Sequence, residues 1–88
     1  MGKYEKLLIK ILRGTSDKNI DFRELLSLLN HLGFEERIKG SHHILTRDGI
    51  DEILNLQNKS GKAKPYQVKQ VRIIIVKYQI KLDDDEES

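Results

Sequence analysis

The segment of residues 33–43 constrains the fold of this chain more than any other. It reads Gly-Phe-Glu-Glu-Arg-Ile-Lys-Gly-Ser-His-His and follows a stretch with helical apolar spacing. Gly33 stands where a helix ends, and residues 34–39 alternate in polarity as a strand does. Gly40 interrupts this strand, and residues 41–47 begin another. The segment therefore predicts a helix followed by two strands, with a pair of histidines at the start of the second.

Three stretches have apolar residues at helical spacing: residues 4–12, 22–32 and 66–80. Asp21 precedes the second stretch and is suited to cap the free N–H groups of a helix. Pro65 precedes the third stretch and suits a first helical turn, where its missing N–H costs nothing. We expect helices over all three.

Residues 51–57 read as a third strand, separated from the second by the tight-turn pair Asp48-Gly49. Residues 58–62 are rich in turn residues and cations, and are expected to form a loop. The order predicts an α+β fold in which helices cover one face of a three-stranded antiparallel meander. We expect one domain over residues 1–82, followed by a disordered acidic tail over residues 83–88.

Composition narrows the class of protein. The chain has 88 residues and no cysteine, so one small domain without disulfides or thiolate metal sites is expected. Its longest apolar run, residues 73–76, is far shorter than the roughly 20 residues of a membrane span. The first ten residues lack the order of a signal peptide. A cytoplasmic protein without a membrane segment is therefore expected.

The net charge of +2 hides an asymmetry. Residues 1–36 hold six basic and six acidic side chains, whereas residues 37–81 hold ten basic and three acidic ones. A basic half of a folded domain indicates a polyanionic partner such as nucleic acid. The alternative is an ordinary solvated lysine and arginine surface.

From Phe22 onward the chain resembles the HicA family, the toxin half of a bacterial toxin–antitoxin pair. The resemblance covers roughly residues 20–80. It rests on Phe22-Arg23-Glu24-Leu25-Leu26, Gly33-Phe34, Lys39-Gly40-Ser41-His42-His43 and Lys64-Pro65-Tyr66-Gln67-Val68.

The resemblance implies a fold like that of double-stranded-RNA-binding domains (α-β-β-β-α) and a ribonuclease that cleaves mRNA. It implies that His42 is catalytic and that a HicB antitoxin covers the active site. The chain departs from the family in two places. Gln57-Asn58 replaces the Pro-His pair that members often carry after the third strand, and the helix of residues 4–12 is an addition to the family core.

His42 is the candidate general acid/base, because an imidazole can take and give protons near neutral pH. Lys39 is the candidate for stabilising negative charge on the phosphoryl group. Six further residues are expected to contact RNA: Gly40, Ser41, Arg47, Lys62, Lys64 and Lys69. No cofactor is expected, and a metal site is disfavoured because neighbouring histidines on a strand diverge.

Each of these residues also has a plainer interpretation. His42 could lie at the boundary between sheet and helices, and the lysines could only keep a loop soluble. The apolar pair Ile44-Leu45 leaves open which histidine faces the core, although His43 is the better candidate for a structural role. Two other functions remain open: an RNA-binding module without catalysis and a purely protein-binding partner.

Overall fold

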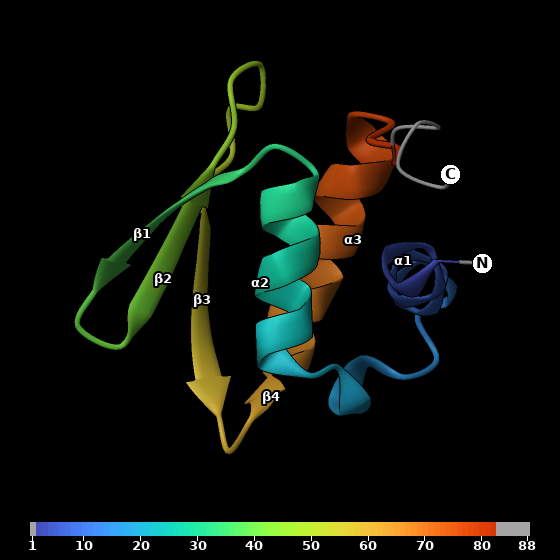
Figure 1. Cartoon of the computed structure of the whole chain (residues 1–88), viewed down its shortest axis with the longest axis horizontal. Helices are drawn as coiled ribbons and strands as arrows, with labels where there is room; N and C mark the ends of the chain where they lie inside the picture. Colours follow the sequence, from blue (N-terminus) through green and yellow to red (C-terminus); the bar gives the residue numbers. More distant parts are fainter. Residues whose placement is uncertain (1, 83–88) are drawn as a thin grey trace.

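Three helices form where the apolar stripes predict them. The computed structural model describes residues 2–82 and contains α1 (Lys3–Arg13), α2 (Phe22–His31) and α3 (Pro65–Lys77), with a short 3₁₀ turn, η1 (Asp17–Asn19). In Figure 1, α2 and α3 lie side by side against the sheet, and α1 crosses them on the side away from the sheet. The molecule thus has three layers, and the third is the helix outside the family resemblance. The predicted acidic tail lies outside the described residues.

Local sequence explains both ends of α2. The Asp21 carboxylate accepts a hydrogen bond from the backbone N–H of Glu24 at 3.0 Å, as the capping prediction requires. Gly33 has a φ of 96°, and the N–H of Phe34 donates back to the carbonyl of Leu29 at 3.0 Å. This left-handed ending turns the chain sharply into the first strand.

The last helix ends earlier than residue 80, where the apolar spacing had placed it. Gln79 adopts the left-handed conformation with a φ of 51°, and the N–H of Ile80 donates to the carbonyl of Ile75. Ile80 is thereby folded back onto the core, where it is buried. The apolar residue that extended the predicted stripe therefore packs from beyond the end of the helix.

The sheet has four antiparallel strands in sequence order, so the expectation of three strands is wrong. The strands are β1 (Glu35–Lys39), β2 (His42–Thr46), β3 (Leu54–Lys59) and β4 (Lys62–Ala63). The expected loop over residues 58–62 is a hairpin instead, with Ser60 and Gly61 at φ values of 52° and 86°. Two positive φ values are typical of the tight turn that joins twisted antiparallel strands.

Contacts distant in sequence explain why β3 begins at Leu54 rather than at residue 51. The Glu52 carboxylate accepts hydrogen bonds from the Tyr78 hydroxyl at 2.5 Å and from Lys77 Nζ at 2.7 Å. These bonds fasten the segment before β3 to the end of α3. The short β4 is likewise held from outside the hairpin, because the N–H of Ala63 donates to the carbonyl of Ile20 at 2.9 Å.

One continuous apolar core joins the layers. Leu45, Leu54 and Leu56 of the sheet are fully or almost fully buried under α2 and α3. The third layer joins through the buried face of α1, which consists of Leu7, Leu8 and Ile11. Each such side chain contributes about 1.5–3 kcal/mol when it is withdrawn from water.

Arg72 of α3 fastens the N-terminal segment to the rest of the protein. Its guanidinium donates two hydrogen bonds to the carboxylate of Asp17, at 2.9 and 3.0 Å, and one to the carbonyl of Ile11 at 3.0 Å. This carbonyl belongs to the last turn of α1, where a cation also complements the helix dipole. Arg72 therefore connects α3 both to the end of α1 and to η1.

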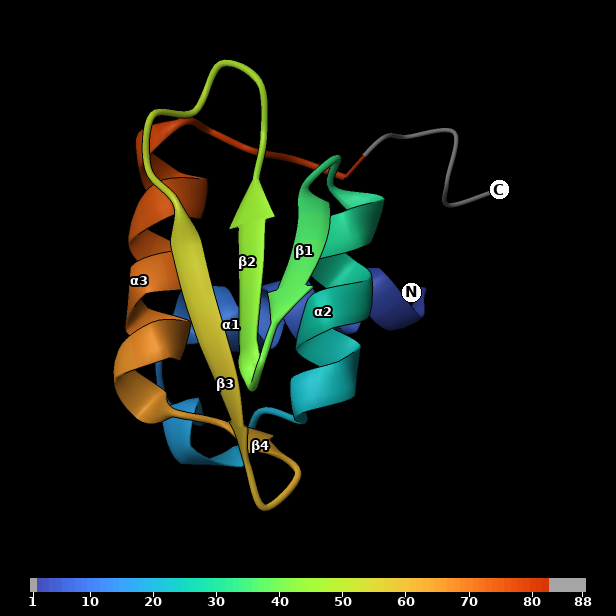
Figure 2. The ribbon, with the colours of Figure 1, turned by 90° about the vertical axis from the view of Figure 1, so that its left-hand side faces the viewer.

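In the described part of the chain, no helix covers the other face of the sheet, which Figure 2 shows from the front. The strand register places Lys39, His42 and Gln57 in one cross-strand row on this face. We call it the open face. Within residues 2–82, none of the helices combines the length and the apolar character that crossing a membrane would require.

Candidate active site

The two neighbouring histidines lie on opposite faces of β2. Leu45 is fully buried, and because side chains alternate along a strand, His43 shares its helix-facing side. The Nδ1–H of His43 donates to Oε2 of Glu36 at 2.7 Å, and its ring meets the ring of Phe22 edge-on with centroids 5.0 Å apart. His43 therefore connects the sheet to α2, in agreement with a structural role.

Glu36 completes this internal contact. Its carboxylate accepts a hydrogen bond from His43 and a second from the Asn30 amide at 3.2 Å. The bond from His43 is the main cause that lowers the pKa of Glu36 from its ordinary value. Glu36 thus remains ionised at neutral pH and anchors the strand that precedes His42.

His42 is exposed on the open face and is held from one side. Its Nδ1 lies 2.8 Å from Oδ1 of Asn55 on β3. Because a carbonyl oxygen can only accept, Nδ1 is the donor of this contact, and in the neutral ring Nε2 then keeps the lone pair. The side-chain nitrogen of Gln57 lies 3.5 Å from Nε2 of His42, in the orientation of a donor. The arrangement suits a proton acceptor at Nε2.

Polar groups converge around this imidazole. Lys39 is the register partner of His42 and therefore lies beside it on the same face. Gln57 donates to Ser41 Oγ at 3.4 Å and accepts from Lys64 Nζ at 2.9 Å. The site thus combines an imidazole with cations contributed by β1 and by the residue before α3.

The turn between Lys39 and His42 explains the glycine at position 40. Gly40 and Ser41 are the two turn residues, and Gly40 has a φ of 62°. A positive φ at the first position alone is typical of the type II′ hairpin turn, which favours glycine there. A Cβ added at Gly40 would meet no atom within 4 Å. Glycine is therefore favoured here by the backbone conformation and not by a lack of space.

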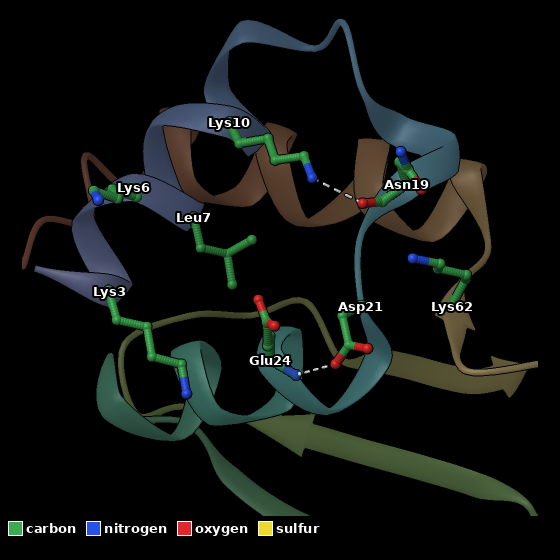
Figure 3. Close-up of a pocket in the computed structure, with 8 residues that line it drawn as sticks. All are labelled: Lys3, Lys6, Leu7, Lys10, Asn19, Asp21, Glu24 and Lys62. Carbon is green, nitrogen blue, oxygen red and sulfur yellow. Dashed lines mark hydrogen bonds between the residues drawn. The ribbon is translucent and has the colours of Figure 1, made fainter.

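Three predicted RNA contacts lie away from this group. Arg47 follows the far end of β2, about 16 Å of extended chain from His42. Lys69 is exposed on α3, one turn past its start. Lys62 lines a hollow of about 640 Å³ between α1, α2 and β4, shown in Figure 3. Lys64, Ser41 and Gly40 are the predicted contacts that the fold brings next to His42.

The hollow at Lys62 is basic, but its charge is partly balanced. The hollow is lined by three lysines of α1 and by the carboxylates of Asp21 and Glu24. The lysines are Lys3, Lys6 and Lys10. Figure 3 shows Lys10 donating to the carbonyl of Asn19, at 2.9 Å. Lys62 is therefore grouped with the N-terminal helix and separate from the open face.

Sequence reasoning missed Asn55 and Gln57 as site residues. The signal that could have found them is the alternation in β3, where Leu54 and Leu56 are buried and the residues between and after them are polar. To use this alternation, one must know where β3 begins and how it is aligned with β2. The predicted strand began three residues too early, at residue 51, and its alignment with β2 was not predicted.

The assembled groups can accept a proton and stabilise an anion. A neutral imidazole offers its lone pair, and the neighbouring ammonium groups attract negative charge. Within residues 2–82, no three His, Cys, Asp or Glu side chains gather in a group that could hold a metal ion.

Comparison with known proteins identifies the family of this chain. The family model described as the HicA toxin of bacterial toxin–antitoxin systems matches residues 22–78, well over half of the chain. The match begins at the first residue of α2 and ends one residue after α3, so it includes the whole open face and leaves out α1. Searches of curated proteins and of solved structures gave no match. The protein therefore belongs to the HicA family of bacterial toxin–antitoxin toxins.

Proposed function

We propose that this protein is an endoribonuclease toxin that cleaves mRNA without a metal ion and uses His42 as its general base. The observation that carries the proposal is the exposed imidazole with its Nε2 lone pair on the open face, in register with Lys39. Toxins of the HicA family are generally ribonucleases, which supports the same reaction.

The proposed reaction uses the 2′-hydroxyl of the RNA as its nucleophile. His42 Nε2 takes the proton of this hydroxyl, and the 2′ oxygen forms a bond to the adjacent phosphorus. The bond from phosphorus to the 5′ oxygen breaks, and that oxygen takes up a proton. The products are a 2′,3′-cyclic phosphate and a 5′-hydroxyl end. General base catalysis of this kind contributes roughly 10²–10⁴ in rate.

Lys39 has the second role in this proposal. Negative charge grows on the phosphoryl oxygens as the 2′ oxygen attacks, and a cation held nearby lowers the cost of that charge. Gly40 and Ser41 would lie against the same phosphate. The proton for the leaving oxygen comes from water or from the exposed Tyr66, because His43 faces the helices.

RNA would be held mainly through its phosphates. Lys64 lies next to the open face, where it donates to Gln57, whereas Lys69, Arg47 and Lys62 would contact more distant parts of the RNA. Such binding reads the shape and backbone of the RNA, as in double-stranded-RNA-binding domains, and depends strongly on salt. The setting would be the cytoplasm, where mRNA is present.

The family also implies an antitoxin partner. We propose that this partner is a HicB-type protein that covers the open face and thereby blocks access to His42. Within residues 2–82, no helix covers this face, as Figure 2 shows, so a partner could reach it without unfolding any of these elements.

The deciding experiment incubates the purified protein with a long RNA in excess EDTA. We expect cleavage by the wild-type protein and its loss in His42→Ala, with RNA binding retained. His31→Ala is the matched control, because this histidine lies at the end of α2, where it stacks on Tyr4. It should cleave at the wild-type rate.

Two outcomes point to the other functions. Intact RNA with tight, salt-sensitive binding would indicate a binding module without catalysis. No RNA affinity even at low salt would leave a protein-binding role. In cells, expression of the wild-type chain alone should arrest growth, whereas His42→Ala should not. Equal growth of the two strains would contradict a toxin.

A further inference from the structure

Gln67, in the first turn of α3, is buried although it is polar. Only 1% of its surface is exposed, and it lies between the helix and the edge of β3. Its Oε1 accepts a hydrogen bond from the backbone N–H of Gln57 at 3.2 Å. Its Nε2 donates to the backbone carbonyl of Asn55, also at 3.2 Å. The oxygen and the nitrogen of the side-chain amide thus each bond the backbone of one strand, at two alternate residues.

The amide of Gln67 takes the place of a neighbouring strand. On β3, the partners of β4 are Asn58 and Lys59, so the outer edge of β3 continues past the end of β4. An N–H and a carbonyl two residues apart along that edge are the groups that a further strand would bond. One glutamine amide offers the same acceptor and donor. It therefore satisfies backbone groups that would cost about 1–3 kcal/mol each if buried without a partner.

The two anchored residues are those whose side chains contact His42. Asn55 holds its Nδ1, and Gln57 faces its Nε2. A shift of the β3 edge would move both contacts at once. We propose that Gln67 is a positioning residue that fixes the tautomer and orientation of His42 through the backbone of β3. The role matters for catalysis only if the proposed function is right, but the effect on the imidazole can be measured without RNA.

The test compares Gln67→Leu with Gln70→Leu in the full-length protein. Leucine keeps the apolar bulk of Gln67 but offers no donor or acceptor, whereas Gln70 is exposed on the same helix. Three quantities are measured: hydrogen exchange of the Gln57 amide, the ¹⁵N shifts of the His42 ring, and kcat and KM for RNA cleavage.

In Gln67→Leu we expect faster exchange at Gln57 and ¹⁵N shifts that report a mixture of the two His42 tautomers. We also expect kcat to fall about tenfold while KM stays near its wild-type value, because the imidazole is misplaced and the phosphate contacts are not. Gln70→Leu should match the wild type in all three quantities.

Should Gln67→Leu fail to fold, Gln67→Met gives the same test, because its unbranched side chain follows the shape of glutamine but has no N–H donor and no carbonyl acceptor. A folded variant whose His42 tautomer equals that of the wild type overturns the proposal, whatever its activity. If the wild-type protein does not cleave RNA at all, the proposed function fails, and the ring shifts still decide whether Gln67 positions His42.

Discussion

Asn55 lies diagonally across from His42 on the neighbouring strand, and its Oδ1 is 2.8 Å from Nδ1 of the imidazole. This single contact determines which ring nitrogen carries the proton and directs the other one outward. A side chain from β3 therefore decides how the histidine of β2 can react.

The first prediction concerns Asn55. Replacing it with leucine removes the acceptor for the Nδ1–H, so His42 should populate both tautomers. A net hydrogen bond of about 1 kcal/mol corresponds to about fivefold in rate, and we expect kcat to fall by at least that factor. Single-turnover cleavage of a defined RNA measures it. Asn58→Leu, on the same strand but away from the ring, serves as the control. An unchanged kcat in Asn55→Leu would contradict the role given to the contact.

The second prediction separates Lys39 from Lys69. Removing a group that stabilises charge in the transition state costs about a hundredfold in kcat. We therefore expect this loss in Lys39→Gln, with little change in KM. Lys69→Gln should instead weaken RNA affinity modestly and reduce the slope of affinity against salt concentration. Equal effects of the two substitutions would show that Lys39 is only a binding cation.

The third prediction concerns acid stability at Glu52. Hydrogen bonds from Lys77 and Tyr78 lower its pKa from 4.5 to about 2 in the folded protein. Because the folded-state pKa is depressed, the carboxylate stabilises the fold above pH 4.5, and this contribution is lost as the pH falls toward 2.

The contribution of Glu52 is measured by urea unfolding of the wild type and of Glu52→Gln at several pH values, which gives the free energy of unfolding of each. The variant should be less stable at pH 7, and the difference should shrink steadily below pH 4.5. A difference that stays constant down to pH 2.5 would rule out the ionised carboxylate as its origin.

The fourth prediction concerns the attachment of α1. Arg72→Met keeps much of the packing volume but removes the hydrogen bonds to Asp17 and Ile11, which lie between α3 and the N-terminal segment. We expect a loss of about 2 kcal/mol in the free energy of unfolding. Asp17→Asn should lose less, and the double variant should be less destabilised than the sum of the two. Strict additivity would argue that the pair does not act together.

The helices of this fold could be predicted from sequence because their signals are local. The stripe of α2, its cap at Asp21 and its ending at Gly33 all lie within one stretch of thirteen residues. The sheet was harder, because β4 depends on a bridge between Asp21 and Lys62 that joins distant parts of the chain. The start of β3 likewise depends on the bonds that Glu52 forms with the end of α3.

The same contrast applies to the site. His42 and Lys39 could be identified as candidates from the segment that contains them. Their partners Asn55, Gln57 and Gln67 could not, because the register of β3 and the placement of α3 bring them together. Polar residues at such positions are indistinguishable from ordinary surface residues until the strands are aligned.

The burial of Leu45 also determines which of the two histidines of β2 faces the solvent. A one-residue slip of this strand would turn every side chain to the opposite side. It would bring His43 to the solvent and press His42 against Phe22, but it would also exchange Leu45 for Ile44 and Thr46 in the interior. Such a slip would expose the leucine and bury a hydroxyl. The hydrophobic preference for one register therefore also selects which imidazole lies on the open face.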